Sequence, residues 1–339
     1  MTVQDAIRTA AREAAASANG RAGVQLRTAE APRLYTYAEQ LVQPPLDWLL
    51  RDYLTTAGLV TLTGKWGVGK SVLATGWAIS VGTGRSWFGH DVQPGGVIYI
   101  AAEPCRPERL LAYQERWPPE MEPRVWFRRQ ALPLGQPAAI DALLRQVEEL
   151  PNAPRLIVAD TYARCAEGID ENDATATGVA VAASDRLIRE TGATVLHLRH
   201  PGHATPDRGR GSSALDAAAD TTLLLAESDG ILTLKVTKQR DASPCDPLRL
   251  RLVPYGPSVV VELEDPSARD LTGAEATALE SLRRIMVPGG ITAKEWRLAT
   301  GLAERTFYDA RGRLVQRGDA VKDGSKYLIP GTATAGGLQ

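Results

Sequence analysis

The chain has 339 residues, of which 44% are hydrophobic and 23% charged, and its formal net charge is −1. This composition is typical of a globular protein of about two domains, and it excludes a chain that grips nucleic acid over its whole surface, which would be more basic. No apolar run approaches the ~20 residues of a membrane-spanning helix, and three widely spaced cysteines without a CxxC pair disfavour a disulfide framework or a zinc knuckle and predict a cytoplasmic protein.

The first 45 residues precede the regular part of the sequence. Residues 4–18 are rich in alanine with charges between, which predicts a helix that ends near Asn19-Gly20. Residues 20–45 contain three prolines and no periodic pattern, which is typical of a linker. We therefore expect an N-terminal helix and arm over residues 1–45.

From residue 46 onward, apolar runs typical of β-strands alternate with segments of helical length. The runs are 59–63, 97–101, 155–159 and 193–198. Strands that are apolar on both faces are typical of a parallel sheet covered by helices on both sides. Further runs then follow at short intervals and predict an antiparallel extension of that sheet: 221–226, 231–238, 248–253 and 258–264. We expect one α/β domain over residues 46–265.

The sequence after residue 270 predicts a second, smaller domain. Thr272-x-x-Glu275 and Thr292-x-x-Glu295 each match a capping box that opens a helix. A third helix is expected over 303–317, and Asp323-Gly324 is expected to turn a short hairpin. Three helices followed by a hairpin form the winged-helix layout, which we expect over 270–330, with a disordered tail over 331–339.

Residues 64–71 (GKWGVGKS) match the phosphate-binding pattern G-x-x-x-x-G-K-[ST] without a mismatch. An apolar strand is predicted before the pattern and a helix after it, as a P-loop requires. In this chemistry Lys70 would bridge the β- and γ-phosphates, and the Ser71 hydroxyl would bind Mg²⁺. We therefore expect ATP and Mg²⁺ as ligands. The expected nucleotide-binding residues are Gly64, Lys65, Trp66, Gly67, Val68, Gly69, Lys70, Ser71 and Val72.

Two acidic residues at the ends of predicted strands complete the expected hydrolytic site. Asp160 directly follows the run RLIVA, as a metal-side carboxylate of a P-loop protein should. The next residue is Thr161, so the base that activates water must come from elsewhere. Glu103 ends the strand VIYIAAE, and ligands of open α/β sheets bind at such carboxyl ends. Glu103 is therefore the expected base, with a surface position in the loop EPCRPE as the alternative.

Six segments resemble the RecA-like ATPases of the plasmid RepA type, hexameric replicative helicases with relatives in phages and mobile elements. In chain order they are GKWGVGKS, YIAAEP, LIVADTYAR, VLHLRHPG, RGSSALDAAAD and LKVTKQRD, and the resemblance covers about residues 46–240. It implies a homo-oligomeric ring, a hexamer, in which each ATP lies between two subunits. A C-terminal winged helix is not required in that family.

The resemblance also implies roles for residues that lie outside the P-loop motif. His200 would sense the γ-phosphate and relay hydrolysis to DNA-binding loops. Arg210 would reach the nucleotide of the neighbouring subunit, and Arg208 in the same segment DRGRGSS is the competing candidate. Lys238 and Arg240 match basic residues near the same boundary. Arg208 and Arg210 could instead lie in a solvated loop, and Lys238 and Arg240 at an exposed strand end.

Two segments are candidates for contact with DNA. The loop 200–211 carries arginines but no aromatic residue, which favours contacts to the phosphates of a single strand in the ring channel. A mobile surface loop is the alternative. The third helix of the winged helix would bury Phe307 and Leu314 and would present five residues to duplex DNA: Arg305, Thr306, Tyr308, Arg311 and Arg313. Winged helices also dock proteins, so both partners stay open.

The histidines and a group of acidic residues are two possible metal sites, but the sequence pattern argues against both. His197 and His200 would face opposite sides of a strand, and Pro201 prevents a helix that would align them with His203. The acidic residues Glu167, Asp170, Glu171 and Asp173 favour a solvated edge.

Three functions fit these sequence features. The first is a ring helicase, and the second is a non-unwinding RecA-like ATPase of recombination, repair or regulation. The third is a nucleotide-gated DNA-binding protein with negligible hydrolysis, which requires that Glu103 is not a base.

Overall fold

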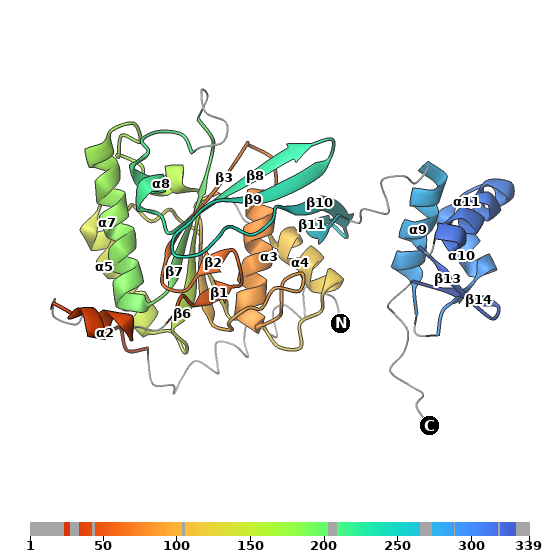
Figure 1. Ribbon diagram of the computed structural model, residues 1–339, viewed down its shortest axis with the longest axis horizontal. Helices are drawn as coiled ribbons and strands as arrows, with labels where there is room; N and C mark the ends of the chain where they lie inside the picture. Colours follow the sequence, from red (N-terminus) through yellow and green to blue (C-terminus); the bar gives the residue numbers. More distant parts are fainter. Residues whose placement is uncertain are drawn as a thin grey trace. The chain divides into compact units, whose positions relative to one another are not determined.

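The computed structural model describes residues 24–27, 34–42, 45–103, 106–202, 209–264, 273–287, 289–317 and 319–329. The chain divides into two compact units, Met1–Leu263 and Glu264–Gln339 (Figure 1). Within the described residues, no helix is long and apolar enough to cross a membrane.

The described part of unit 1 is built on a nine-stranded sheet with the order β11-β10-β9-β8-β3-β7-β6-β4-β5. The strands that pair in parallel are β3 (Leu59–Gly64), β4 (Gly96–Ala101), β5 (Val125–Arg128), β6 (Pro154–Asp160), β7 (Thr194–Arg199) and β8 (Thr221–Ser228). The antiparallel strands are β9 (Ile231–Gln239), β10 (Leu248–Tyr255) and β11 (Ser258–Leu263). The predicted α/β sheet with an antiparallel extension is confirmed. Its direction reverses after β8, one strand later than expected, because β8 pairs in parallel with β3.

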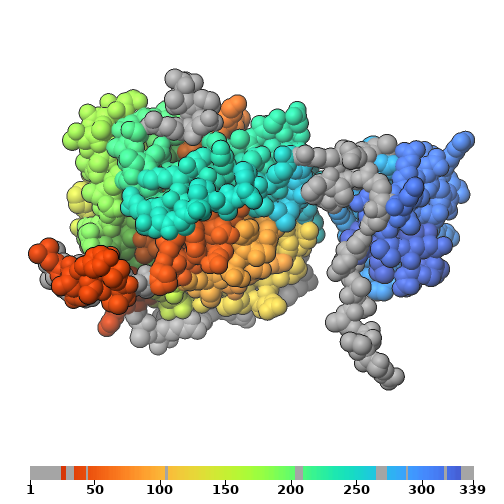
Figure 2. All heavy atoms as spheres, in the orientation of Figure 1, coloured from red at the N-terminus to blue at the C-terminus, as the bar shows by residue number. Residues whose placement is uncertain are grey.

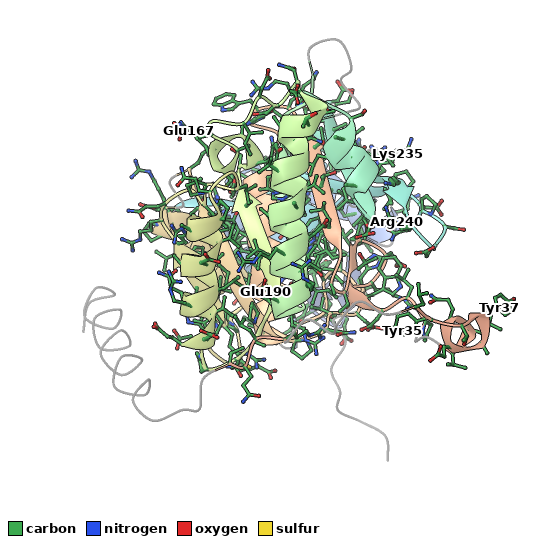
Figure 3. The ribbon with its side chains drawn as sticks, turned by 90° about the vertical axis from the view of Figure 1, so that its left-hand side faces the viewer. Tyr35, Tyr37, Glu167, Glu190, Lys235 and Arg240 are labelled. Carbon is green, nitrogen blue, oxygen red and sulfur yellow. The ribbon has the colours of Figure 1, made fainter. Side chains whose placement is uncertain are left out.

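Helices cover both faces of this sheet (Figures 1 and 3). On one face lie α3 (Lys70–Thr83) and α4 (Pro107–Arg116), and on the other α5 (Pro137–Glu148) and α7 (Ala174–Thr191). Neighbouring strand residues alternate between the faces, so that Val60 packs in the α3 layer and Leu59 in the α7 layer. Almost all of α3 is buried, because α4 and β11 also pack against it.

The remaining elements of unit 1 are short. β1 (Trp48–Leu50) pairs with β2 (Leu54–Thr55), and α6 (Tyr162–Cys165) and α8 (Ala214–Ala218) follow β6 and β7 in the chain. In the space-filling view the turquoise strands of the antiparallel extension lie at the surface of the unit (Figure 2).

Residues 24–27 of the N-terminal arm touch the α7 side of unit 1. Leu26 packs there, and the backbone N–H of Arg27 donates to Glu190 O at 2.8 Å. The arm also contains a short helix, α2 (Tyr37–Leu41), which the sequence pattern missed and which a capping box formed by Thr36 and Glu39 opens. Figure 3 shows Tyr35 and Tyr37 at this projecting helix. The helix predicted over 4–18 lies outside the described residues.

Unit 2 contains α9 (Gly273–Ile285), α10 (Ala293–Thr300) and α11 (Glu304–Arg317). Its described strands pair in the order β12-β14-β13, with bounds Ile291–Thr292, Lys326–Leu328 and Val321–Asp323. Phe307 and Leu314 are fully buried, as expected, and the capping box of Thr292 is confirmed. Thr272 lies outside the described residues. The strand β12 was not predicted.

Candidate functional site

The loop between β3 and α3 has a backbone shape that requires glycine. Gly67 and Gly69 have φ values of 77° and 97°, a region that side-chain-bearing residues rarely adopt. A Cβ atom on Gly67 would meet nothing within 4 Å, so this part of the loop is open to a ligand. A curled loop that leads into the N-terminus of a 14-residue helix is suited to bind phosphate.

Lys70 lies against this loop and is almost fully buried. Its Nζ donates to Gly64 O at 2.7 Å and to Lys65 O at 2.9 Å. Burial lowers the pKa of Lys70 to about 8, and the negative charges of Asp160 and Glu103 oppose that shift. The ammonium is thus held at the start of α3, beside the carboxylates that end the neighbouring strands.

Asp160 ends β6, and both of its carboxylate oxygens accept a hydrogen bond. The Ser71 hydroxyl donates to Oδ1 at 3.0 Å, and the Tyr99 hydroxyl donates to Oδ2 at 2.7 Å. Burial raises the pKa of Asp160, while these two donors and the charge of Arg109 oppose the rise. Ser71 and Asp160 are neighbouring oxygen ligands of the kind that Mg²⁺ prefers, so the residues present fit that ion.

Glu103 lies next to Asp160 through backbone and side-chain contacts. The N–H groups of Ala102 and Glu103 donate to Asp160 O at 2.9 and 3.2 Å. The Thr161 hydroxyl donates to Glu103 Oε1 at 3.3 Å. Thr161 occupies the position where many P-loop proteins carry the base, and here it supports the carboxylate of the neighbouring strand instead.

The two described histidines of the β7 region have different surroundings. Nδ1 of His200 lies 3.4 Å from Lys70 Nζ, and burial together with that positive charge lowers the pKa of His200. His197 points to the opposite side, where its Nε2 lies 2.8 Å from the Ser184 hydroxyl, and burial lowers its pKa to about 3. His197 is therefore a neutral core residue. His203 lies outside the described residues.

Arg210 is half exposed and makes contacts within its own chain. Its Nη2 donates to Glu171 Oε1 at 3.0 Å, and its backbone N–H donates to His200 O at 2.8 Å. Arg199, which the sequence analysis missed, is buried; it pairs with Asp216 and donates to Arg210 O at 2.8 Å. These contacts tie the segment of Arg210 to the end of β7. Arg208 lies outside the described residues.

The acidic residues near Glu171 also have local partners. Asp173 caps α7 by accepting from Ala176 N at 2.7 Å, and Asp170 accepts from Asn172 N at 2.9 Å. Among the described residues, no group of three or more His, Cys, Asp or Glu side chains is arranged to hold a metal ion.

Lys238 and Arg240 are bonded to the segment that follows β7. Lys238 Nζ donates to the carbonyls of Asp216, Ala217 and Ala219 at 2.6–3.0 Å, and so satisfies the C-terminal end of α8. Arg240, at the surface in Figure 3, pairs with Asp220 at 2.8 Å. A role for these two side chains at a neighbouring nucleotide stays a prediction.

The residues predicted to contact duplex DNA all lie on α11. Arg305, Thr306 and Tyr308 are exposed. Arg311 lies over the rings of Tyr308 and Tyr327, 4.7 and 5.2 Å from their centroids, and Arg313 donates to the buried Glu275 at 3.1 Å. Arg311 and Arg313 thus have structural partners, and the contact of this helix with DNA stays a prediction.

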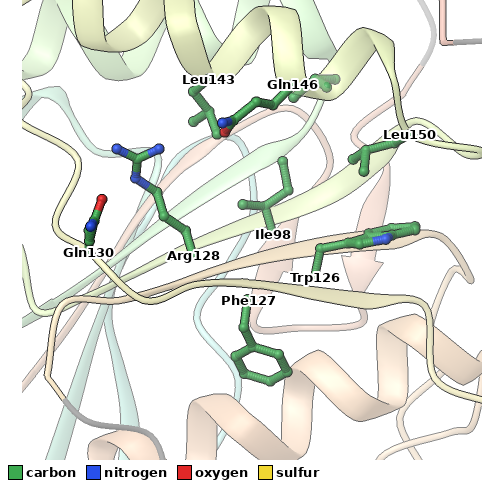
Figure 4. A pocket seen from close by; sticks show the side chains of 9 residues that line it. Ile98, Trp126, Phe127, Arg128, Gln130, Leu143, Gln146 and Leu150 are labelled. Atoms are coloured by element: carbon green, nitrogen blue, oxygen red, sulfur yellow. The ribbon is translucent and has the colours of Figure 1, made fainter. Parts of the chain in front are cut away.

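Two hollows of unit 1 lie away from the P-loop. One, of about 320 Å³, lies between β5 and α5 and includes Trp126, Arg128 and Leu143 (Figure 4). The other, of about 920 Å³, lies beside the end of α3 and includes Trp87 and Trp117. Neither contains a residue of the P-loop.

Comparison with known proteins gives a matching family model and similarities to solved structures. The family model described as AAA domain matches residues 26–206. No curated protein matches the chain. A solved structure titled "Crystal structure of the RadB recombinase" is similar with a TM-score of 0.47 and 15% sequence identity, over 62% of this chain and 93% of that chain.

Proposed function

The chain belongs to the AAA domain family, and from this premise we propose that it is a Mg²⁺-dependent, RecA-like ATPase that acts on DNA as a ring of identical subunits. One observation carries the proposal. The site lies across four strands that are neighbours in the order β3-β7-β6-β4. Their carboxyl ends carry, in the same order, Lys70, His200, Asp160 and Glu103. This is the edge at which open α/β sheets bind ligands.

The P-loop side of the site would hold the nucleotide. The Lys70 ammonium exchanges the carbonyls of Gly64 and Lys65 for phosphate oxygens, and the N-terminus of α3 faces the same charge. Ser71 and Asp160 would hold Mg²⁺, which supplies charge neutralisation on the transferred phosphoryl group when bound.

The opposite side would activate the attacking water. Glu103 accepts the proton of that water, and the Thr161 hydroxyl keeps its carboxylate in place. The imidazole of His200 lies beside Lys70, where a ring N–H can donate to a phosphate oxygen and so respond to the loss of that oxygen.

The assembly would complete the site. Arg210 is exposed by about half, so its guanidinium is able to leave Glu171 for a neighbouring subunit's nucleotide. In phosphoryl transfer such an arginine raises turnover by about 10³–10⁵-fold. A ring that closes in this way is the RepA-like arrangement.

For the biological task we propose a helicase or translocase of plasmid, phage or mobile-element replication, with single-stranded DNA in the ring channel. A second candidate is a non-unwinding ATPase of recombination, repair or regulation. The second compact unit supports the second candidate. We propose that the helices and small sheet in its described part form a winged helix, which would tether the ATPase to duplex DNA.

A forked-DNA unwinding assay with ATP, run beside native mass measurement, separates the two. The helicase proposal expects a ring and strand separation that Lys70→Ala abolishes. A monomer that hydrolyses ATP but separates no strands would contradict the helicase proposal and leave the ATPase proposal standing. A chain that neither binds nor hydrolyses ATP would overturn both.

A further inference from the structure

Strand β4 brings a buried hydroxyl group to the metal side of the site. Tyr99 is fully buried, and its ring packs beside that of Phe127, with centroids 5.5 Å apart. Its hydroxyl donates to Asp160 Oδ2 at 2.7 Å and also lies 3.5 Å from Ser71 O. One phenol oxygen therefore touches both residues that would hold Mg²⁺.

The two oxygens of Asp160 are distinguished by their donors. Oδ1 accepts from the Ser71 hydroxyl, and Oδ2 accepts from Tyr99. An aspartate carboxylate turns easily about its last torsion, so a free carboxylate would present either oxygen to a metal.

We propose that Tyr99 is a positioning residue for the divalent cation. Its hydrogen bond fixes the rotation of the Asp160 carboxylate, so that Oδ1 faces Ser71 and the ion. This inference rests on the proposed function, because it concerns the metal of the same site. Tyr99 acts through Asp160 and need not contact the nucleotide.

The chain offers a matched control in Tyr113. This second buried tyrosine also packs against α3, and its hydroxyl donates to Val72 O at 2.8 Å. Tyr113 has no hydrogen bond with Asp160. Tyr113→Phe and Tyr99→Phe thus remove the same oxygen from neighbouring layers of one core, but only Tyr99→Phe removes a donor to Asp160.

The test is equilibrium binding of a fluorescent ATP analogue to the full chain, first in EDTA and then during titration with MgCl₂. For Tyr99→Phe we expect unchanged affinity in EDTA and a Mg²⁺ midpoint raised by about tenfold, since a hydrogen bond to a charged group is of that order. For Tyr113→Phe both quantities should match those of the wild type.

Several outcomes would overturn the inference. The first is a Mg²⁺ midpoint of Tyr99→Phe within twofold of the wild type. An equal loss of affinity with and without metal would assign Tyr99 a structural role only. Equal shifts in both variants would trace the effect to packing around α3. A wild-type chain that binds no ATP analogue would instead remove the proposed function itself.

Discussion

The proposed metal side of the candidate site, at Asp160, and its exposed side, at Arg210, are built in opposite ways. Asp160 is 3% exposed and has a donor on each carboxylate oxygen, both from its own core. Arg210 has a side chain that is 54% exposed and one ion pair, with Glu171. The groups proposed to act within one subunit are thus fixed by the fold. A group proposed to serve a second molecule is held by a contact that water and salt weaken easily.

The largest expected effect on ATP turnover comes from removing the exposed arginine. Arg210→Ala should lower ATP turnover of the assembled protein by about 10³-fold, because the transition-state charge loses its partner. Mixing Arg210→Ala with Lys70→Ala subunits should restore part of the phosphate release, since some interfaces then pair an intact P-loop with an intact arginine. Arg145→Ala, an exposed change on α5, is the control. Mixtures no more active than the separate variants would place Arg210 outside the neighbour's site.

The second largest effect on ATP turnover is expected at Glu103, the proposed base. Glu103→Gln should lower turnover by about 10²-fold or more while ATP binding persists, because the amide cannot accept the proton of water. Phosphate release and analogue binding measure the two quantities, with the exposed Glu149→Gln as the control. Unchanged turnover would exclude Glu103 as the base. Negligible hydrolysis by the wild type would favour a nucleotide-gated DNA-binding protein.

The buried histidine His197 should make the stability of the fold depend on pH. The pKa of His197 is lowered to about 3 in the fold, so between pH 6.5 and 3 the unfolded chain binds the extra proton. Stability should therefore fall as pH drops below about 6.5, by up to about 1.4 kcal/mol per pH unit. Chemical unfolding of the wild type and of His197→Asn measures this, and the variant should show the shallower dependence. Equal slopes would remove His197 as the cause.

The smallest expected effect tests the ion pair that holds Arg210. Glu171→Gln should raise turnover of the assembled protein by up to about fivefold, because an exposed ion pair is worth about 0–1 kcal/mol. Salt should reduce the difference between variant and wild type. Lower turnover in Glu171→Gln would mean that Glu171 positions Arg210 productively.

Sequence alone predicted most of what strand order and fixed spacing determine. The P-loop, the strand end at Asp160 and the opposed faces of His197 and His200 follow from local patterns, whereas β4 ends at Ala101, two residues before the expected strand end at Glu103. Tyr99 was missed because a tyrosine within an apolar strand looks like ordinary core, and its hydroxyl contact depends on the side-by-side placement of β4 and β6. Arg199 was missed because its ion pair with Asp216 likewise depends on the tertiary fold, and the segment of Asp216 has no regular sequence pattern.

The place of β7 has a consequence for the order in which the molecule acquires its ligand site. β7 follows β6 in the chain but lies between β3 and β6 in the sheet. The hydrogen bond from Ser71 to Asp160 therefore spans the end of a strand that must already be inserted. If β7 were not yet inserted, β3 and β6 would lack the strand that joins them, and Ser71 would not be held opposite Asp160. The appearance of Mg²⁺-dependent nucleotide binding during refolding would thus time the insertion of that one strand.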